Sequence, residues 1–139
     1  MSYLPHQTVA RQLPVHLAAA PGAVSNGYPP YGVHEFPSAS GRLPVHRTDV
    51  GALLLADAFG AASCVSVRDT EAMAPLEGRE RVSADELAGT KGDLPLDRLA
   101  LERLTRTKHV REIRIVDGTG RGQLTAALTG NPAGTTVEA

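Results

Sequence analysis

The chain has 139 residues, 14 basic and 15 acidic side chains, and a formal net charge of −1. This balance gives no general electrostatic attraction to nucleic acid or to anionic lipid, and the length fits one small domain with appendages. The lone cysteine, Cys64, excludes an internal disulfide and a cysteine-based zinc site.

Residues 1–48 have an unusual composition, with seven of the ten prolines and all three tyrosines. Closely spaced prolines disfavour helix and central strand, so we expect an extended N-terminal arm. Such a segment cannot cover its own apolar groups, and aromatic side chains dominate binding at interfaces. The arm is therefore predicted to bind a partner through seven side chains: Leu13, Val15, Tyr28, Tyr31, Phe36, Leu43 and Val45.

A short motif, Leu-Pro-Val-His, occurs at residues 13–16 and again at 43–46. Two copies are too few for a solenoid, which needs at least about three. Repeated docking of one extended motif and chance in a proline-rich segment are both open interpretations.

The body is predicted over residues 49–130. An almost wholly apolar segment, 50–62, favours a buried helix, with a strand through Leu53–Leu55 as the alternative. Residues 64–67 alternate and are β-branched, which is typical of a strand. Residues 69–81 are expected to be a loop, and Ser83 and Glu86 form a capping box that begins a short helix.

The last part of the body combines a helix with a hairpin. Asp93 and Pro95 are typical of a helix start, so a helix is expected from Pro95 to about Thr107. Residues 111–116 and 122–129 alternate on either side of a glycine-rich turn and predict a β-hairpin. The expected fold class is therefore α+β: about three helices and a C-terminal β-hairpin, followed by a tail at 131–139.

No pattern typical of an enzyme, a metal site or a cofactor site is found. The five histidines lie at least ten residues apart, whereas metal ligands usually come as close pairs. The glycines of 118–122 precede an expected strand, whereas phosphate-binding glycine loops open a helix. We therefore expect no catalytic residues, no metal and no cofactor.

The predicted function is that of a non-enzymatic assembly protein that docks on neighbouring subunits, including copies of itself. By analogy of architecture, the specific hypothesis is a bacteriophage virion component: a capsid decoration, head or connector protein. No signal peptide and no apolar stretch of membrane-spanning length is recognised, so a soluble protein made in the cytoplasm is expected.

A DNA-binding protein is the alternative. The expected element order resembles that of a winged-helix domain, in which helix 95–107 would enter the major groove and hairpin 111–129 would form the wing. The resemblance implies DNA contacts from five basic residues: Arg103, Arg106, Lys108, Arg114 and Arg121. Against it, the two helices are separated by more residues than helix-turn-helix units use, and Asp93 and Asp97 would repel phosphates.

Overall fold

The computed structural model describes Val15, Ala19 and residues 48–139. The strands are β1 (Cys64–Arg68), β2 (Arg81–Ser83), β3 (Glu112–Asp117) and β4 (Thr135–Glu138). The α-helices are α2 (Thr48–Ala58), α3 (Thr70–Met73), α4 (Ala84–Gly89), α5 (Arg98–Leu104) and α6 (Gln123–Leu128), and Ala74–Leu76 form the short 3-10 helix η2. The predicted α+β class is confirmed.

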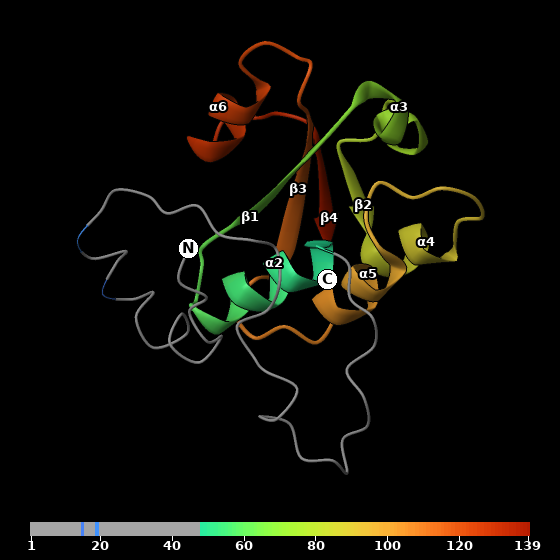
Figure 1. Cartoon of the computed structure of the whole chain (residues 1–139). Helices are drawn as coiled ribbons and strands as arrows, with labels where there is room; N and C mark the ends of the chain where they lie inside the picture. Colours follow the sequence, from blue (N-terminus) through green and yellow to red (C-terminus); the bar gives the residue numbers. More distant parts are fainter. Residues whose placement is uncertain (1–14, 16–18, 20–47) are drawn as a thin grey trace, which may run out of the picture.

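The four strands form one mixed sheet in the order β1-β3-β4-β2. β1 runs parallel to β3, β3 is antiparallel to β4, and β4 is parallel to β2. Helices α2, α4 and α5 gather at one end of the strands, whereas α3 and α6 lie at the other (Figure 1). Since successive side chains of a strand point to opposite faces, the register decides which residues meet the helices.

One face of the sheet packs against the helices and forms an entirely aliphatic core with them. The core cluster joins Val82, Ile113, Ile115 and Val137 from the strands with leucines of the helices: Leu53, Leu87, Leu101 and Leu104. All of these side chains are at most 4% exposed. Fully burying one such side chain stabilises the fold by about 1.5–3 kcal/mol. Because this burial fixes the strands against the helices, it also fixes the residues on the opposite face of the sheet.

Several predicted elements are confirmed. Residues 50–62 were expected to be a helix, and α2 occupies Thr48–Ala58 with Val50 and Leu53 buried. The Ser83 hydroxyl accepts the Glu86 amide N–H at 3.1 Å, as the capping motif predicts. The Glu86 carboxylate, however, pairs with Arg79 at 2.9 Å instead of returning to the helix start.

The expected start of the third helix is wrong. α5 begins at Arg98, with Asp97 in the N-cap position, rather than at Pro95. The Pro95 carbonyl accepts the Arg68 Nε–H at 2.5 Å, and the Asp97 N–H donates to the Asp49 carboxylate at 3.1 Å. These contacts with β1 and α2 accompany an extended Asp97 backbone (ψ 136°), so tertiary contacts hold this segment outside the helix.

The expected loop at 69–81 also contains structure. Asp69 caps α3 by accepting the Ala72 N–H at 2.8 Å, and η2 follows directly. Arg81 is the first residue of β2. Charge and proline content suggested a loop, but short elements are stabilised here by the sheet and core that they border, with Leu76 buried at 2% exposure.

The predicted hairpin at 111–129 is wrong in its second half. β3 occupies the first expected strand, but residues Gln123–Leu128 form helix α6. Alanine and leucine favour helix intrinsically, and the Leu124/Leu128 spacing suits a helix as well as a strand. The antiparallel partner of β3 is β4, which lies within the expected tail at 131–139.

Most of the predicted arm, 1–48, lies outside the described residues, so the arm remains a prediction. Val15 is helical, which differs locally from the extended conformation expected of the arm. In the described part of the chain, no helix combines the length and apolar character needed to cross a bilayer.

Candidate functional site

A cleft lies on the sheet face opposite the aliphatic core. Its volume is about 550 Å³, and it is lined by Glu80, Arg81, Arg114, Gly130, Pro132, Ala133, Gly134 and Thr136. The strands β2, β3 and β4, together with Glu80 just before β2, supply its charged and polar side chains, and the loop 130–134 supplies backbone and small residues. We call this the β2–β4 cleft.

The strand register brings three polar residues of this cleft into one row. Arg81 of β2 pairs with Thr136 of β4, and Thr136 pairs with Arg114 of β3. Laterally paired residues point to the same face of a sheet. Two arginine residues therefore flank one threonine on this face, although the residues are up to 55 positions apart in the sequence.

The loop 130–134 is fixed against the sheet. The Arg114 Nη1–H donates to the Asn131 carbonyl at 3.0 Å, which joins the loop to β3. Gly134 has φ +65°, and a Cβ at this position would lie 1.9 Å from the Ile115 carbonyl oxygen. Only glycine allows the backbone to come this close while adopting a left-handed conformation.

Burial and charge differ among the three residues of the row. Thr136 is 7% exposed, and within residues 48–139 its hydroxyl has no hydrogen-bond partner. Arg81 forms an exposed ion pair with Glu138, whereas the described residues provide Arg114 with no carboxylate partner. The cleft can therefore offer N–H and O–H donors to an acceptor group, with Arg114 the less neutralised of its two cations.

A second polar cluster lies where β1 and β3 end. The Asp117 carboxylate accepts hydrogen bonds from the Thr119 hydroxyl at 2.7 Å, the Thr119 amide at 2.8 Å and the Thr70 hydroxyl at 2.8 Å. These bonds, the one from the Thr119 hydroxyl first, hold the pKa of Asp117 below its ordinary value. The polar groups of these side chains are hydrogen-bonded to one another, so the cluster stabilises the turn before α6.

Two further aspartates connect the helices to the rest of the body. Asp57 accepts the backbone N–H groups of Lys108, His109 and Val110 at 3.0, 2.6 and 3.1 Å. Asp49 pairs with Arg68 at the start of α2. Both carboxylates are used within the fold and are not available to a ligand.

Cys64 lies on β1 and is partly buried. Desolvation and then the charge of Asp49 raise the pKa of its thiol, so it is a weaker nucleophile than a free cysteine at neutral pH. Over the described residues, no group of three or more His, Cys, Asp or Glu side chains is arranged to hold a metal ion.

Of the seven predicted partner-binding residues, the structure describes one, Val15. Its side chain is 67% exposed and is available for a contact. The other six, Leu13, Tyr28, Tyr31, Phe36, Leu43 and Val45, lie outside the described residues, so their role remains a prediction.

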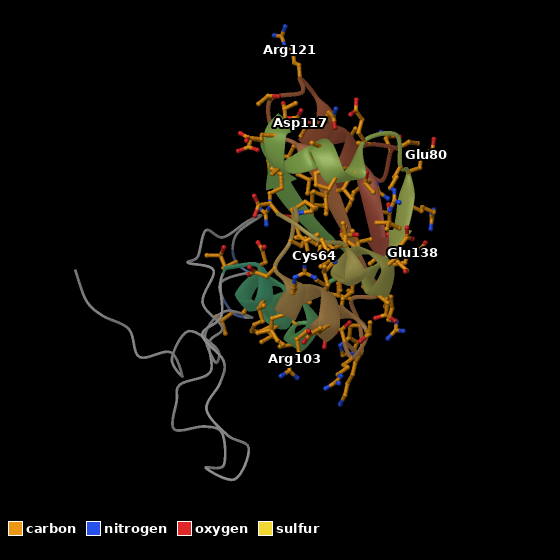
Figure 2. All side chains as sticks on the ribbon, turned by 90° about the vertical axis from the view of Figure 1, so that its right-hand side faces the viewer. Cys64, Glu80, Arg103, Asp117, Arg121 and Glu138 are labelled. Atoms are coloured by element: carbon orange, nitrogen blue, oxygen red, sulfur yellow. The ribbon has the colours of Figure 1, made fainter. Side chains whose placement is uncertain are left out.

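The five residues predicted for DNA contact do not form one surface. Arg103 and Arg121 lie at opposite ends of the body (Figure 2). The backbone of Lys108 is bound by Asp57, and Arg106 follows the end of α5. Arg114 faces the β2–β4 cleft, and the turn expected to form the wing leads into α6 rather than into a second strand.

Three charged or polar lining residues of the cleft, Glu80, Arg81 and Thr136, were missed from the sequence. The β-branched run Thr135-Thr136-Val137 was a signal for a strand, but its proline- and glycine-containing surroundings suggested a tail. No local signal places Thr136 between Arg81 and Arg114, because this neighbourhood is set by strand pairing.

Comparison with known proteins shows a sequence similarity that covers most of the chain. The molybdenum storage protein subunit beta of Azotobacter vinelandii is 36% identical over 137 residues, which cover 91% of this chain. The chain is thus similar to a molybdenum storage subunit. It spans 50% of the length of that relative. No family model matches the chain.

This relationship corrects both functional hypotheses from the sequence. The virion assignment, as a capsid decoration, head or connector protein, is wrong, because the similarity points to metal storage. The winged-helix DNA-binding alternative is wrong for the same reason, and the absent wing and dispersed arginines agree with that correction. Analogy of architecture misled here because one fold can serve unrelated functions.

Proposed function

We propose that this protein stores molybdenum as one subunit of a multi-chain assembly. The observation that carries the proposal is the 36% identity to a molybdenum storage subunit over 91% of this chain. Storage requires binding and release of a cargo rather than chemical turnover, so the proposed role remains non-enzymatic. Molybdenum is the cargo in this proposal and not a resident cofactor.

The test is the metal content of the purified protein. The full chain is produced in cells grown with added molybdate and purified without chelators, and its molybdenum is measured by inductively coupled plasma mass spectrometry. We expect molybdenum to co-purify well above the amount carried by an unrelated protein of similar charge handled in parallel. Equal molybdenum in the two preparations would remove the proposal.

The subunit part of the proposal has its own measurement. The relative is named as a subunit, which supports an assembly that includes other chains. Size-exclusion chromatography with light scattering should give a mass of several chains. A monomer at all accessible concentrations, with molybdenum bound, would keep the storage role and refute self-assembly.

A further inference from the structure

We propose that the β2–β4 cleft binds a tetrahedral oxyanion, held mainly by Arg114 and Thr136, and that molybdate is the oxyanion it takes. The identity of the anion rests on the proposed function, since dissolved molybdenum at neutral pH is the molybdate dianion. The binding chemistry rests on the cleft alone. A phosphate group has the same shape and charge type, so the two sources need separate measurements.

The spacing of the donors suits a small anion. Arg81 and Arg114 are each one strand away from Thr136. Neighbouring strands are about 4.8 Å apart, which puts the two arginine Cα atoms about 10 Å from each other. Two arginine side chains can bend towards one another over that distance, and guanidinium groups match the paired oxygens of oxyanions.

The Thr136 hydroxyl is a further donor that an anion in the cleft can reach. The Thr136 residue is only 7% exposed, lines the cleft and lies between the two arginines in the strand register. Among residues 48–139 no group accepts its hydrogen, and the oxygen is not a fully buried atom, so the hydroxyl is open to water or to a ligand in the cleft. An oxyanion oxygen in the cleft would accept this hydrogen bond.

Two carboxylates, Glu80 in the cleft and Glu138 beside it, determine which of the two arginines is freer to bind an anion. Glu138 forms an ion pair with Arg81, and Glu80 lies on the same side of the body as Glu138 (Figure 2). Both carboxylates oppose an anion. Arg114 donates to a neutral carbonyl, so it keeps its charge and further N–H groups for a ligand. We therefore expect Arg114 to dominate and Arg81 to be restrained by Glu138.

This arrangement predicts that some substitutions lower the affinity for an oxyanion and that one raises it. Arg114→Gln should weaken oxyanion binding by about tenfold or more, since one charge-assisted pair is lost. Thr136→Val, which keeps the branched shape, should weaken it by roughly threefold to tenfold. Glu138→Gln should strengthen it by a few fold, because Arg81 is released. Arg121→Gln, which changes an exposed arginine that does not line the cleft, is the matched control.

The experiment is isothermal titration of the full chain at low ionic strength, with sodium molybdate in one series and sodium phosphate in another. Thermal melts verify that each variant is folded, and the gain expected from Glu138→Gln cannot come from misfolding. Weakening by Arg114→Gln and Thr136→Val, with Arg121→Gln unchanged, supports the site. No binding of either anion, or equal losses for Arg114→Gln and Arg121→Gln, overturns it.

The possible outcomes test the oxyanion site and the proposed storage function separately. Molybdenum that co-purifies equally with wild type, Arg114→Gln and Thr136→Val would refute the site and leave the storage role standing. Arg114-dependent binding of phosphate but not of molybdate would support an oxyanion cleft and refute molybdate as its ligand. Arg114-dependent binding of molybdate supports both.

Discussion

The Asp57 carboxylate and the His109 backbone N–H are 2.6 Å apart, although 52 residues separate them in the sequence. The same carboxylate also accepts the neighbouring amides of Lys108 and Val110. One side chain at the end of α2 thus organises the connection from α5 to β3. The contact resembles a helix N-cap in chemistry, since a carboxylate satisfies several consecutive amides.

Replacement of Asp57 by alanine should reduce the free energy of unfolding by about 2–3 kcal/mol, because three amides lose their acceptor. The measurement is the urea midpoint at pH 7. Asp57→Asn keeps one acceptor oxygen and should lose less, and alanine at the exposed Glu77 is the control for a surface substitution. A loss below about 0.5 kcal/mol for Asp57→Ala, the range of surface changes, would contradict this role.

Stability should fall when the pH drops below about 4. Desolvation raises the pKa of Asp57, but the amides of His109, Lys108 and Val110 outweigh it, so the pKa lies below the ordinary 3.8. The pKa of Asp117 is lowered as well. The unfolded chain then takes up protons first, so this stabilisation is complete above about pH 4 and is lost as pH falls through the folded values.

The check is the melting temperature between pH 7 and pH 3. The double variant Asp57→Asn/Asp117→Asn should have a lower melting temperature at pH 7 and a smaller further decrease below pH 4. Identical decreases in wild type and double variant would assign the acid sensitivity to other groups.

Gly134→Ala should destabilise the protein severely, by more than about 3 kcal/mol, because its Cβ would collide with the Ile115 carbonyl. Gly60 offers a matched control: it has the same φ of +65°, yet a Cβ there meets nothing within 4 Å. Gly60→Ala should therefore lower the free energy of unfolding only by the cost of a left-handed backbone conformation for alanine, about 1–2 kcal/mol. Similar urea midpoints for the two variants would show that loop 130–134 moves away from β3 at little cost.

Cys64 should react slowly with iodoacetamide in the native protein. Burial and the charge of Asp49 raise the pKa of the thiol, so less thiolate is present at pH 8. We expect the native rate to be lower by about tenfold or more than the rate in concentrated urea. The rate profile against pH distinguishes the pKa effect from simple shielding: the native midpoint should lie above the midpoint in urea, and coincident midpoints would contradict the shift.

Local chemistry in the sequence was sufficient for several elements. The apolar segment that became α2, the β-branched run of β1, the Ser83 cap and the alternation of β3 each depend on neighbours in the chain. Helix and strand propensity, periodicity and capping are local properties, so they can be read without the fold.

Only the tertiary structure decided the rest. The segment 123–128 satisfies both a strand and a helix pattern, and β3 takes Thr135–Glu138 as its antiparallel partner instead. Pro95 and Asp97 are held out of α5 by contacts with Arg68 and Asp49. The β2–β4 cleft likewise exists because strand pairing brings Arg81, Thr136 and Arg114 together. Pairing between distant strands depends on the whole core, and that information is not local to any of the three residues.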